Sequence, residues 1–263
     1  MNIGIIGLGV VGQACRSGFE LQGHQVRVHD TNLATTVDDL LNTDIVYICI
    51  STPSNTDGSI DQHSVEEIIN TLNHRQYAGV VAIKSTVLPG TTERFNNNTN
   101  LTVCFVPEFL RERCAAEDFI KNHKLLVVGT CNEHAYRTVV ASHGWLHQQV
   151  QQLTETEAEI LKYYNNTFNA VRVVFSNIMF ELCEKTGADY ARIKDTYLRR
   201  GVASADYMDC ADDLRGYGGM CLPKDVNALA HYLTTLGIDV DLFQAVHNDN
   251  TKFKTTVFKG MRS

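Results

Sequence analysis

The chain has few prolines and tryptophans, four and one in 263 residues, and its apolar runs are short. Runs such as 3–11 and 45–50 have the length of a strand, so no membrane-spanning helix is predicted. An excess of basic residues is also missing, because 23 Lys and Arg stand against 30 Asp and Glu. This balance argues against general binding to nucleic acid or to a membrane surface.

Paired cysteine motifs are absent from the sequence. The eight cysteines are scattered without a C-x-x-C pair, and several lie inside apolar patterns. His143 and His147 are four residues apart, but no third ligand is evident, so no metal site is predicted. The N-terminus has no basic segment of the kind that begins a secretory signal. The sequence therefore predicts a protein of the reducing cytoplasm.

A glycine pattern follows the first apolar run. Gly7, Gly9 and Gly12 form G-x-G-x-x-G at the start of a helical stretch, where a pyrophosphate can approach backbone N–H groups. A second predicted strand, 25–29, ends at Asp30, which is placed to accept hydrogen bonds from an adenosine ribose. Neither of the next two residues could pair with a 2′-phosphate. The pattern therefore favours NAD over NADP.

Apolar runs alternate with helical patterns through the first half of the chain. Further strands are expected at 44–50, 78–84, 101–106 and 124–129, and helices at 62–73, 91–97 and 132–142. This alternation predicts a Rossmann-like, mostly parallel sheet covered by helices on both faces. Ligands of such sheets bind beyond the carboxyl ends of the strands. The loops that begin at Ser51, Lys84 and Pro107 should therefore surround one crevice.

The second half of the chain has helical patterns only. Thr154 and Glu157 form the capping-box pattern T-x-x-E ahead of a long helix, which Gly187 should end. Two further helices and a long loop are expected at 189–199, 239–259 and 201–220. We therefore expect two domains, a Rossmann-like domain over residues 1–152 and an all-helical domain over residues 153–263.

The long helix carries an apolar seam. Its members are Leu161, Tyr164, Phe168, Val171, Phe175, Ile178 and Leu182. Such a seam needs a partner surface, which a second copy of the chain would supply. Lys162, Asn166 and Asn169 share a face beside the seam. A single lysine on a helix is usually solvated, but three polar groups near the domain junction are equally consistent with a functional site.

The most informative stretch is GYGGMCLPKD, residues 216–225. Proline is favoured in the first turn of a helix, so Pro223 predicts a helix start ahead of the apolar pattern 226–236. Cys221 would then lie at the positive end of this helix, beside the ammonium of Lys224. Both neighbours favour thiolate over thiol. A thiolate in this position is a nucleophile for an electrophilic carbon.

Together these segments resemble the UDP-glucose/GDP-mannose dehydrogenase family. GYGGMCLPKD resembles the family motif G-[FY]-G-G-x-C-x-[PQ]-K-D, and residues 84–92 and 107–112 are similar to its K-S-T-V-P-x-G-T and P-E-F-L-x-E segments. Residues 159–166 look like the helix with the family's lysine and asparagine. The resemblance covers nearly the whole chain and implies oxidation of the primary alcohol of a nucleotide-linked hexose to a carboxylate, by two hydride transfers to NAD.

The resemblance also implies catalytic roles. Cys221 would attack the aldehyde of the first oxidation, and the resulting thiohemiacetal can release a second hydride and leave a thioester. Lys162, aided by Asn166, would stabilise the developing alkoxide. Asp225 would orient or deprotonate a water, and Glu108 would act as the base in thioester hydrolysis. Asp225 could equally serve only a helix N-terminus, where carboxylates are favoured.

Other positions match residues that contact the cofactor or the sugar. Thr86 and Glu112 would line the nicotinamide and the sugar, although Glu112 could instead pair with Arg111 or Arg113 on the surface. Further cofactor contacts are expected from Ser51, Thr52, Pro53 and Lys224. Further sugar contacts are expected from Phe109, Leu110, Arg111, Tyr217 and Gly218, the first three through their backbone.

The chain departs from the family pattern in several places. Residues 30–44 form only a short connection where the family has another helix and strand, and Val106 replaces a small polar residue. The sequence stops at Ser263, whereas the family continues into a further α/β domain that grips the nucleotide. Arg200 and Arg215 are only loose counterparts of an arginine that the family lends to the neighbouring subunit. We therefore expect weaker nucleotide-sugar binding, unless a separate chain supplies the missing nucleotide-binding domain.

Two other functions stay open on the sequence. A β-hydroxyacid dehydrogenase of the 3-hydroxyisobutyrate kind also joins a dinucleotide fold to helices and uses a lysine, but its chemistry needs no cysteine. A non-catalytic subunit would bind NAD or a partner enzyme without turnover. The presence of Cys221, Lys162 and Glu108 together weighs against this second alternative, because a binding protein has no physical need of that set.

Overall fold

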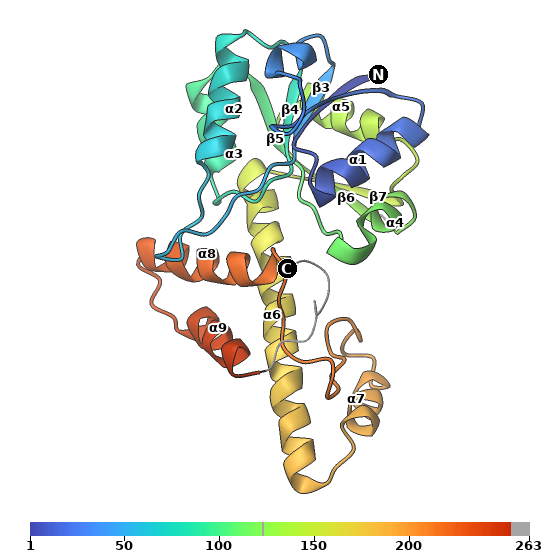
Figure 1. Ribbon diagram of the computed structural model, residues 1–263, viewed down its shortest axis with the longest axis vertical. Helices are drawn as coiled ribbons and strands as arrows, with labels where there is room; N and C mark the ends of the chain where they lie inside the picture. The colour runs from blue at the N-terminus through green and yellow to red at the C-terminus, as the bar shows by residue number, and fades with distance from the viewer. Residues whose placement is uncertain (123, 254–263) are drawn as a thin grey trace. The chain divides into compact units, whose positions relative to one another are not determined.

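The structure, a computed structural model, describes residues 1–122 and 124–253 (Figure 1). The chain divides into two compact units. Unit 1 comprises Met1–Pro53 and Ile60–Lys162, and unit 2 comprises Ser54–Ser59 and the chain from Tyr163 onward. The chain therefore leaves unit 1 for a short loop, returns, and leaves it again within a long helix.

Unit 1 contains a seven-stranded sheet in the order β2-β1-β3-β4-β5-β6-β7. The strands are β1 (Asn2–Ile6), β2 (Gln25–His29), β3 (Ile45–Ile48), β4 (Val80–Ile83), β5 (Thr102–Phe105), β6 (Leu125–Gly129) and β7 (Gln149–Leu153). The first five are parallel, β6 is antiparallel to β5, and β7 is parallel to β6. This arrangement confirms the predicted Rossmann-like, mostly parallel sheet. Because β2 and β3 flank β1, the strand order reverses at β1.

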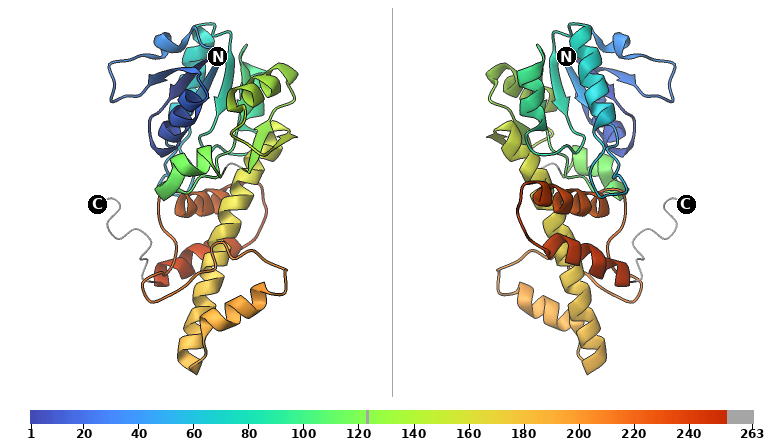
Figure 2. Two further views of the ribbon diagram at one scale, coloured as in Figure 1. Left: turned by 90° about the vertical axis from the view of Figure 1, so that its right-hand side faces the viewer. Right: turned by 90° about the vertical axis from the view of Figure 1, so that its left-hand side faces the viewer.

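Helices cover both faces of this sheet (Figures 1 and 2). One face carries α1 (Val10–Leu21), α4 (Ala115–Ile120) and α5 (Glu133–His143), and the other carries α2 (His63–His74) and α3 (Thr91–Asn98). Two 3₁₀ helices, Val37–Leu40 and Glu112–Cys114, complete the unit. Every residue of β3 and β4 is buried, as expected for apolar strands covered on both faces.

Besides the two 3₁₀ helices, two elements of unit 1 were not predicted from the sequence. β7 has the sequence QVQQL and lies at the edge of the sheet, so its three glutamines are partly or fully exposed and the apolar signal is missing. The short helix α4 is fixed mainly by Phe119, which is fully buried against α1. Neither segment carries enough periodic apolar residues to identify it.

Unit 2 is helical. It contains most of α6 (Glu155–Thr186), followed by α7 (Tyr190–Leu198), α8 (Leu222–Thr235) and α9 (Leu242–Lys252). Its core joins α6, α8 and α9 through Val174, Val226 and Val246. The predicted helix 239–259 is thus observed as the shorter α9, and its last residues from 254 on lie outside the described residues. Within this unit, α8 and α9 lie beside α6 (Figure 2).

The ends of α6 agree with the sequence signals. The backbone N–H of Thr154 donates to the carboxylate of Glu157 at 2.8 Å, and the N–H of Glu157 donates to the Thr154 hydroxyl at 3.3 Å. These two bonds are the predicted capping box. Gly187 has a φ of +71°, the left-handed conformation that ends helices.

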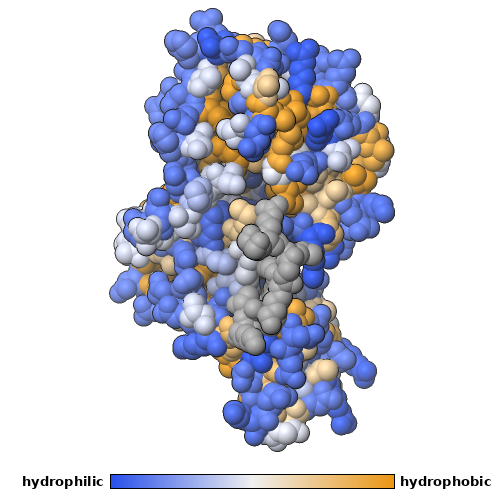
Figure 3. All heavy atoms as spheres, viewed as in Figure 1, coloured by the Kyte–Doolittle hydropathy of each residue, from blue (hydrophilic) through white to orange (hydrophobic). Residues whose placement is uncertain are grey.

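The apolar seam of α6 faces outward. Phe168, Phe175 and Leu182 are 52%, 57% and 52% exposed, whereas Asn166 and Asn177 of the same helix are buried. In the space-filling view, hydrophobic side chains are interspersed with hydrophilic ones where α6 and α7 lie (Figure 3). The helix therefore buries much of its polar face and exposes much of its apolar one. Among the described residues, no helix combines the length and apolar character needed to cross a membrane.

Candidate active site

The glycine loop joins β1 to α1 at the point where the strand order reverses. Gly7 has a φ of +93°, and a Cβ at Gly12 would overlap the Gly7 carbonyl oxygen, so neither position accepts a side chain. A Cβ at Gly9 would meet nothing within 4 Å. No side chain caps the N-terminus of α1, and its first turn contains no acidic residue. Backbone N–H groups at the start of a helix have no partners within the helix, so this end of α1 is suited to bind a pyrophosphate.

Asp30 lies directly after β2 and is tied to the same loop. Its carboxylate accepts hydrogen bonds from the backbone N–H of Leu8 at 2.7 Å and of Asn32 at 3.0 Å. These bonds, that from Leu8 first, hold the pKa of Asp30 below its usual range. The ionised carboxylate keeps lone pairs available for ribose hydroxyls. The three glycines and Asp30 therefore fit a bound NAD.

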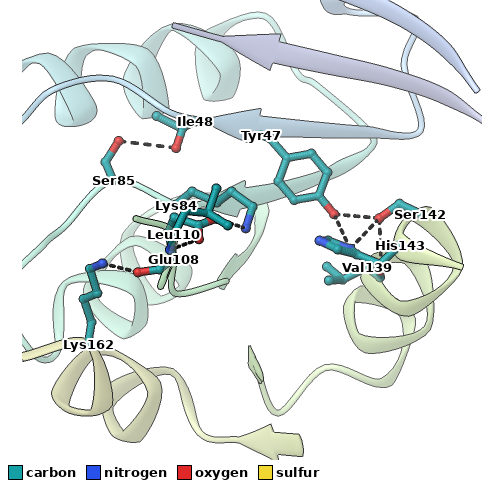
Figure 4. Close-up of polar contacts among 10 residues, drawn as sticks. All are labelled: Tyr47, Ile48, Lys84, Ser85, Glu108, Leu110, Val139, Ser142, His143 and Lys162. Carbon is teal, nitrogen blue, oxygen red and sulfur yellow. Dashed lines mark hydrogen bonds and ion pairs between the residues drawn. The ribbon is translucent and has the colours of Figure 1, made fainter. Parts of the chain in front are cut away.

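Glu108 is the centre of a buried polar cluster in unit 1. One carboxylate oxygen accepts from the backbone N–H of Leu110 at 2.7 Å, and the other lies 3.3 Å from the ammonium of Lys84. Lys162 donates a hydrogen bond to the backbone carbonyl of Glu108. Lys84 and Lys162 approach this residue from two sides (Figure 4). Two contacts thus hold the carboxylate in one orientation, and a third holds the backbone of the same residue.

Lys162 is buried and does not have the solvated position usual for a lysine. It extends from the second turn of α6 toward the segment after β5, where its ammonium also lies 5.7 Å from the centre of the Phe109 ring. Its ammonium is therefore a desolvated charge, and such a charge acts more strongly on a developing anion than one in water. Three of the candidate site residues, Lys162, Glu108 and Phe109, therefore lie together in unit 1.

Arg111 and Glu112 have different surroundings. Arg111 makes a bidentate ion pair with Asp118, at 2.6 Å and 2.9 Å, and its backbone N–H donates to the same carboxylate. The arginine holds the pKa of Asp118 well below its usual range. Arg111 is thus paired with Asp118. Glu112 is half-buried in the 3₁₀ helix that follows.

The loops after β3 and β4 carry the other expected cofactor contacts. Thr52 is buried between the exposed residues Ser51 and Pro53, and Thr86 is half-buried. Glu159 of α6 fixes the far end of the second loop, because it accepts from the N–H groups of Gly90 and Thr92 at 2.6 Å and 2.8 Å. Burial outweighs these bonds and raises the pKa of Glu159 to about 6.

The cysteine loop leads into α8 in unit 2. Cys221 is the N-cap residue of this helix, and Pro223 occupies its first turn. The helix thus begins at Leu222, ahead of the apolar pattern, as the position of Pro223 predicts. Cys221 is exposed, in contrast to Tyr217, which is 3% exposed, and to the half-buried Gly218. The sulfur therefore lies at the positive end of a helix dipole and is accessible to a reactant.

Asp225 of α8 and Asn166 of α6 are in direct contact. Asp225 is fully buried and accepts a hydrogen bond of 2.5 Å from the side-chain amide of Asn166. Its other oxygen lies 2.6 Å from the ammonium of Lys224, an ion pair without the alignment of a hydrogen bond. Lys224 is therefore engaged with Asp225, so its charge is shared and not directed at Cys221 alone. Asp225 also lies in the first turn of α8, where a carboxylate is favoured.

The looser candidates do not join these clusters. Arg215 donates to Asn177 at 2.8 Å and pairs with Glu181, both in unit 2, and Arg200 is exposed. In the described part of the chain, no group of three or more His, Cys, Asp and Glu side chains could hold a metal ion. All eight cysteines are described, and none is in a disulfide.

Sequence reasoning gave no role to four residues that shape these sites: Lys84, Glu159, Asn177 and Asn250. Lys84 had a visible signal, since a charged residue directly ends the apolar run of β4. The other three look like ordinary polar helix residues. Their burial, between 0% and 8% exposed, is what distinguishes them.

The sequence matches two models of one protein family. Residues 29–150 match the NAD binding domain of the UDP-glucose/GDP-mannose dehydrogenase family, and residues 156–252 match its central domain. The two matches follow the order of the chain and together take in most of it.

Individual relatives agree with this match. The UDP-glucose 6-dehydrogenase of Pseudomonas aeruginosa is 32% identical over 251 residues, which cover 87% of this chain and 53% of the relative. That of Haloferax volcanii is 28% identical, with 95% and 69% covered. A UDP-glucose dehydrogenase structure from Pyrobaculum islandicum is 27% identical with a TM-score of 0.87, covering 95% of this chain and 68% of its own. The chain thus spans between about half and two thirds of these proteins.

Proposed function

Because the chain belongs to the UDP-glucose/GDP-mannose dehydrogenase family, we propose that it oxidises the primary alcohol of a nucleotide-linked hexose, similar to UDP-glucose, to the carboxylate. NAD is the cofactor of the matched N-terminal domain. The observation that carries the proposal is the exposed Cys221 at the N-terminus of α8, in a loop with the sequence GYGGMCLPKD.

When bound, NAD accepts a hydride from the substrate carbon. The chain's own part in this step is binding and orientation. Gly7, Gly9 and Gly12 would hold the pyrophosphate, and Asp30 the ribose. The loops with Ser51, Thr52, Pro53, Thr86 and Glu112, together with Lys224, would line the rest of the cofactor.

Cys221 would make the second oxidation possible. Its thiolate adds to the aldehyde carbon, and the carbonyl electron pair moves to the oxygen. The resulting tetrahedral carbon can give up a hydride and become a thioester. Water then displaces the sulfur, which leaves as a thiolate and regenerates Cys221. This sequence needs the sulfur, Lys162 and the nicotinamide to meet in one cleft, and that convergence is part of the proposal.

The buried polar groups have matching roles. Lys162, with Asn166, would stabilise the alkoxide that forms during thiolate attack, and its burial supports this role because a desolvated charge acts more strongly. Glu108, held by Lys84 and Leu110, would accept a proton from the hydrolytic water. The full burial of Asp225, its hydrogen bond from Asn166 and its ion pair with Lys224 favour an orienting role over a proton-accepting one.

Sugar contacts and partners belong to the same proposal. Phe109, Leu110, Arg111, Tyr217 and Gly218 would contact the sugar. A homodimer through the exposed seam of α6 would cover that apolar face. A separate chain that contributes a nucleotide-binding surface is a further proposed partner. In functional terms, residues 1–152 would bind NAD, and residues 153–263 would carry catalysis and dimerisation. The eight cysteines, none of them in a disulfide, support a cytoplasmic location.

The test is incubation of the protein with NAD and a panel of UDP-, GDP- and ADP-sugars. We expect NADH formation, and by mass spectrometry an acyl adduct on Cys221. Cys221→Ser should abolish turnover, whereas Cys131→Ser, a matched change at another exposed cysteine, should leave it unchanged.

Three outcomes would redirect the proposal. If no nucleotide sugar supports NADH formation, the dehydrogenase function fails for this chain. Turnover of a β-hydroxyacid that persists in Cys221→Ala would identify the other dehydrogenase class. Stabilisation by NAD without turnover, with activity only after a full-length relative or a separate nucleotide-binding domain is added, would identify a non-catalytic subunit.

A further inference from the structure

Two buried asparagines hold the backbone that leads to Cys221. Asn177 lies in α6 and Asn250 in α9, and their exposures are 1% and 8%. Their amide groups meet the segment 210–217, just ahead of the cysteine. Helices that are distant in the sequence therefore fix one loop of unit 2 at two successive residues.

The side-chain oxygen of Asn177 accepts hydrogen bonds from three donors in this segment. It accepts from the backbone N–H of Gly216 at 3.1 Å, from Nε of Arg215 at 2.8 Å and from Sγ of Cys210 at 3.3 Å. Its own amide N–H donates to the carbonyl of Val173 at 2.9 Å, which fixes the side-chain orientation. Replacing this residue by an apolar one would leave buried donors without their acceptor.

The side chain of Asn250 forms hydrogen bonds with both backbone polar groups of the next residue, Tyr217. Its oxygen accepts from the N–H of Tyr217 at 2.8 Å, and its amide donates to the Tyr217 carbonyl at 2.9 Å. A neighbouring β-strand would pair the same two groups. The side chain of Tyr217 packs into the core with Val174 and Val226, so both its backbone and its ring are held.

The loop needs such restraint because its own sequence provides little. Gly216 and Gly219 have φ values of +60° and +78°, conformations that glycine adopts at no steric cost but at a high cost in conformational freedom. Between Tyr217 and the first turn of α8, the backbone carries three small or flexible residues, Gly218, Gly219 and Met220. Contacts from outside the loop must therefore select one path for it.

We propose that Asn177 and Asn250 are positioning residues, which hold Gly216 and Tyr217 so that the Cys221 sulfur is presented to the substrate in one orientation. This inference rests on the proposed function of Cys221. Displacement of a reacting group by about 1 Å can cost roughly 100-fold in rate, so loss of either amide should reduce turnover.

The first test compares Asn250→Ala with Asn248→Ala. Asn248 lies on the same helix, and its side-chain oxygen only accepts from Gln244 at the surface. We expect Asn250→Ala to lower kcat by roughly 10- to 100-fold, with KM for NAD and for the nucleotide sugar within about twofold of wild type. Asn248→Ala should match wild type. A change in KM alone, or no change, would overturn the inference.

Asn177 gives a second, conservative comparison. Asn177→Asp keeps the oxygen that accepts from Gly216 and Arg215. It loses the bond to Val173 and adds a charge that faces the guanidinium of Arg215, so it should retain most of kcat. Asn177→Leu removes the acceptor and should lose about as much as Asn250→Ala. This pair decides the question if Asn250→Ala fails to fold. Equal loss in both Asn177 variants would contradict a positioning role for the oxygen.

A third measurement does not require turnover. Alkylation of Cys221 by iodoacetamide at neutral pH can be followed by mass spectrometry of its peptide. Asn250→Ala and Asn177→Leu should be alkylated at least about threefold more slowly than wild type and Asn248→Ala, because the sulfur is no longer fixed at the helix N-terminus, which favours thiolate. If wild type reduces no NAD, the proposed function fails, and these rates still decide the inference. Equal rates would overturn it.

Discussion

The ammonium of Lys84 lies 3.3 Å from the carboxylate of Glu108, and the two side chains are only 1% and 9% exposed. Burial alone would lower the pKa of Lys84, but the charge of Glu108 and those of nearby groups raise it above its usual value. Each charge therefore depends on the other. Because Glu108 also accepts from the Leu110 N–H, the pair fixes where this carboxylate points.

Removing one partner of this pair should be costly. We expect Lys84→Met to lower the free energy of unfolding by about 3–5 kcal/mol, because the buried carboxylate of Glu108 would lose its ion-pair partner. The double variant Lys84→Met/Glu108→Gln should lose less than the sum of the single changes. Urea unfolding followed by circular dichroism measures both. Additive losses would show that the two charges do not stabilise each other.

Two glycines of the first loop should respond differently to alanine. Gly9 has a φ of −65° and open space around its Cβ position, so Gly9→Ala should change the free energy of unfolding by less than about 0.5 kcal/mol. Its methyl group would occupy the expected pyrophosphate space, and we expect NAD to bind at least roughly tenfold more weakly. Isothermal titration calorimetry measures the affinity for NAD, and thermal unfolding measures the change in stability.

Gly12→Ala is the contrasting variant. Its Cβ would overlap the carbonyl oxygen of Gly7, so the loop itself must move. We expect a loss of stability of about 1–3 kcal/mol in addition to weaker NAD binding. If Gly9→Ala were also destabilised, the space beside Gly9 would not be free in the folded protein.

Glu159 should make the stability of unit 1 depend on pH. Its usual pKa is near 4.5 and its folded value about 6, so the folded state holds the proton more tightly. The contribution is therefore fully present below about pH 4.5 and is lost as pH rises through about 6, by roughly 2 kcal/mol. Glu159→Gln should flatten the profile of unfolding free energy in this window.

Glu157 of the same helix is a control, because its pH dependence of stability has the opposite sign. The Thr154 N–H lowers the pKa of Glu157, so its contribution is present above its ordinary pKa and is lost as pH falls. Glu157→Gln should therefore matter at neutral pH and lose its effect in acid. Identical pH profiles for the Glu157 and Glu159 variants would contradict these assignments.

The outward seam of α6 predicts a dimer that charge can dissociate. We expect wild type to sediment as a dimer at micromolar concentration, and Phe168→Glu/Phe175→Glu to weaken association by at least about 100-fold. Lys185→Glu, an exposed change near the end of the same helix, should leave association unchanged. A monomeric wild type would remove the basis for this expectation.

The sequence predicts most of the fold where local signals are strong. The wholly apolar β3 and β4, the capping box at Thr154 and the helix stop at Gly187 are all observed. β7 was missed because an edge strand tolerates glutamines, which carry no apolar period. Apolar periodicity in a sequence identifies a strand or helix only when much of that element is buried.

For the site, the sequence predicts residue types better than contacts. The contact of Asn166 with Asp225 joins two residues singled out from their motifs. The pairing of Lys84 with Glu108 and the grip of Asn250 on Tyr217 depend on residues brought together from distant segments. No spacing along the chain contains that information, so these partners could only be recognised in the folded protein.

The detour of Ser54–Ser59 into unit 2 has a practical consequence. Asp57 approaches His231 of α8 within 4.0 Å, and the Gly58 backbone comes close to Asn227. The helical unit is therefore assembled from two separate stretches of polypeptide. An excised fragment that starts at Tyr163 would lack the shorter stretch and leave this side of α8 bare. Expression of a fragment that starts at Tyr163 would thus separate residues 54–59 from α8. A fusion that joins residues 54–59 to this fragment is the rational way to obtain the helical unit in isolation.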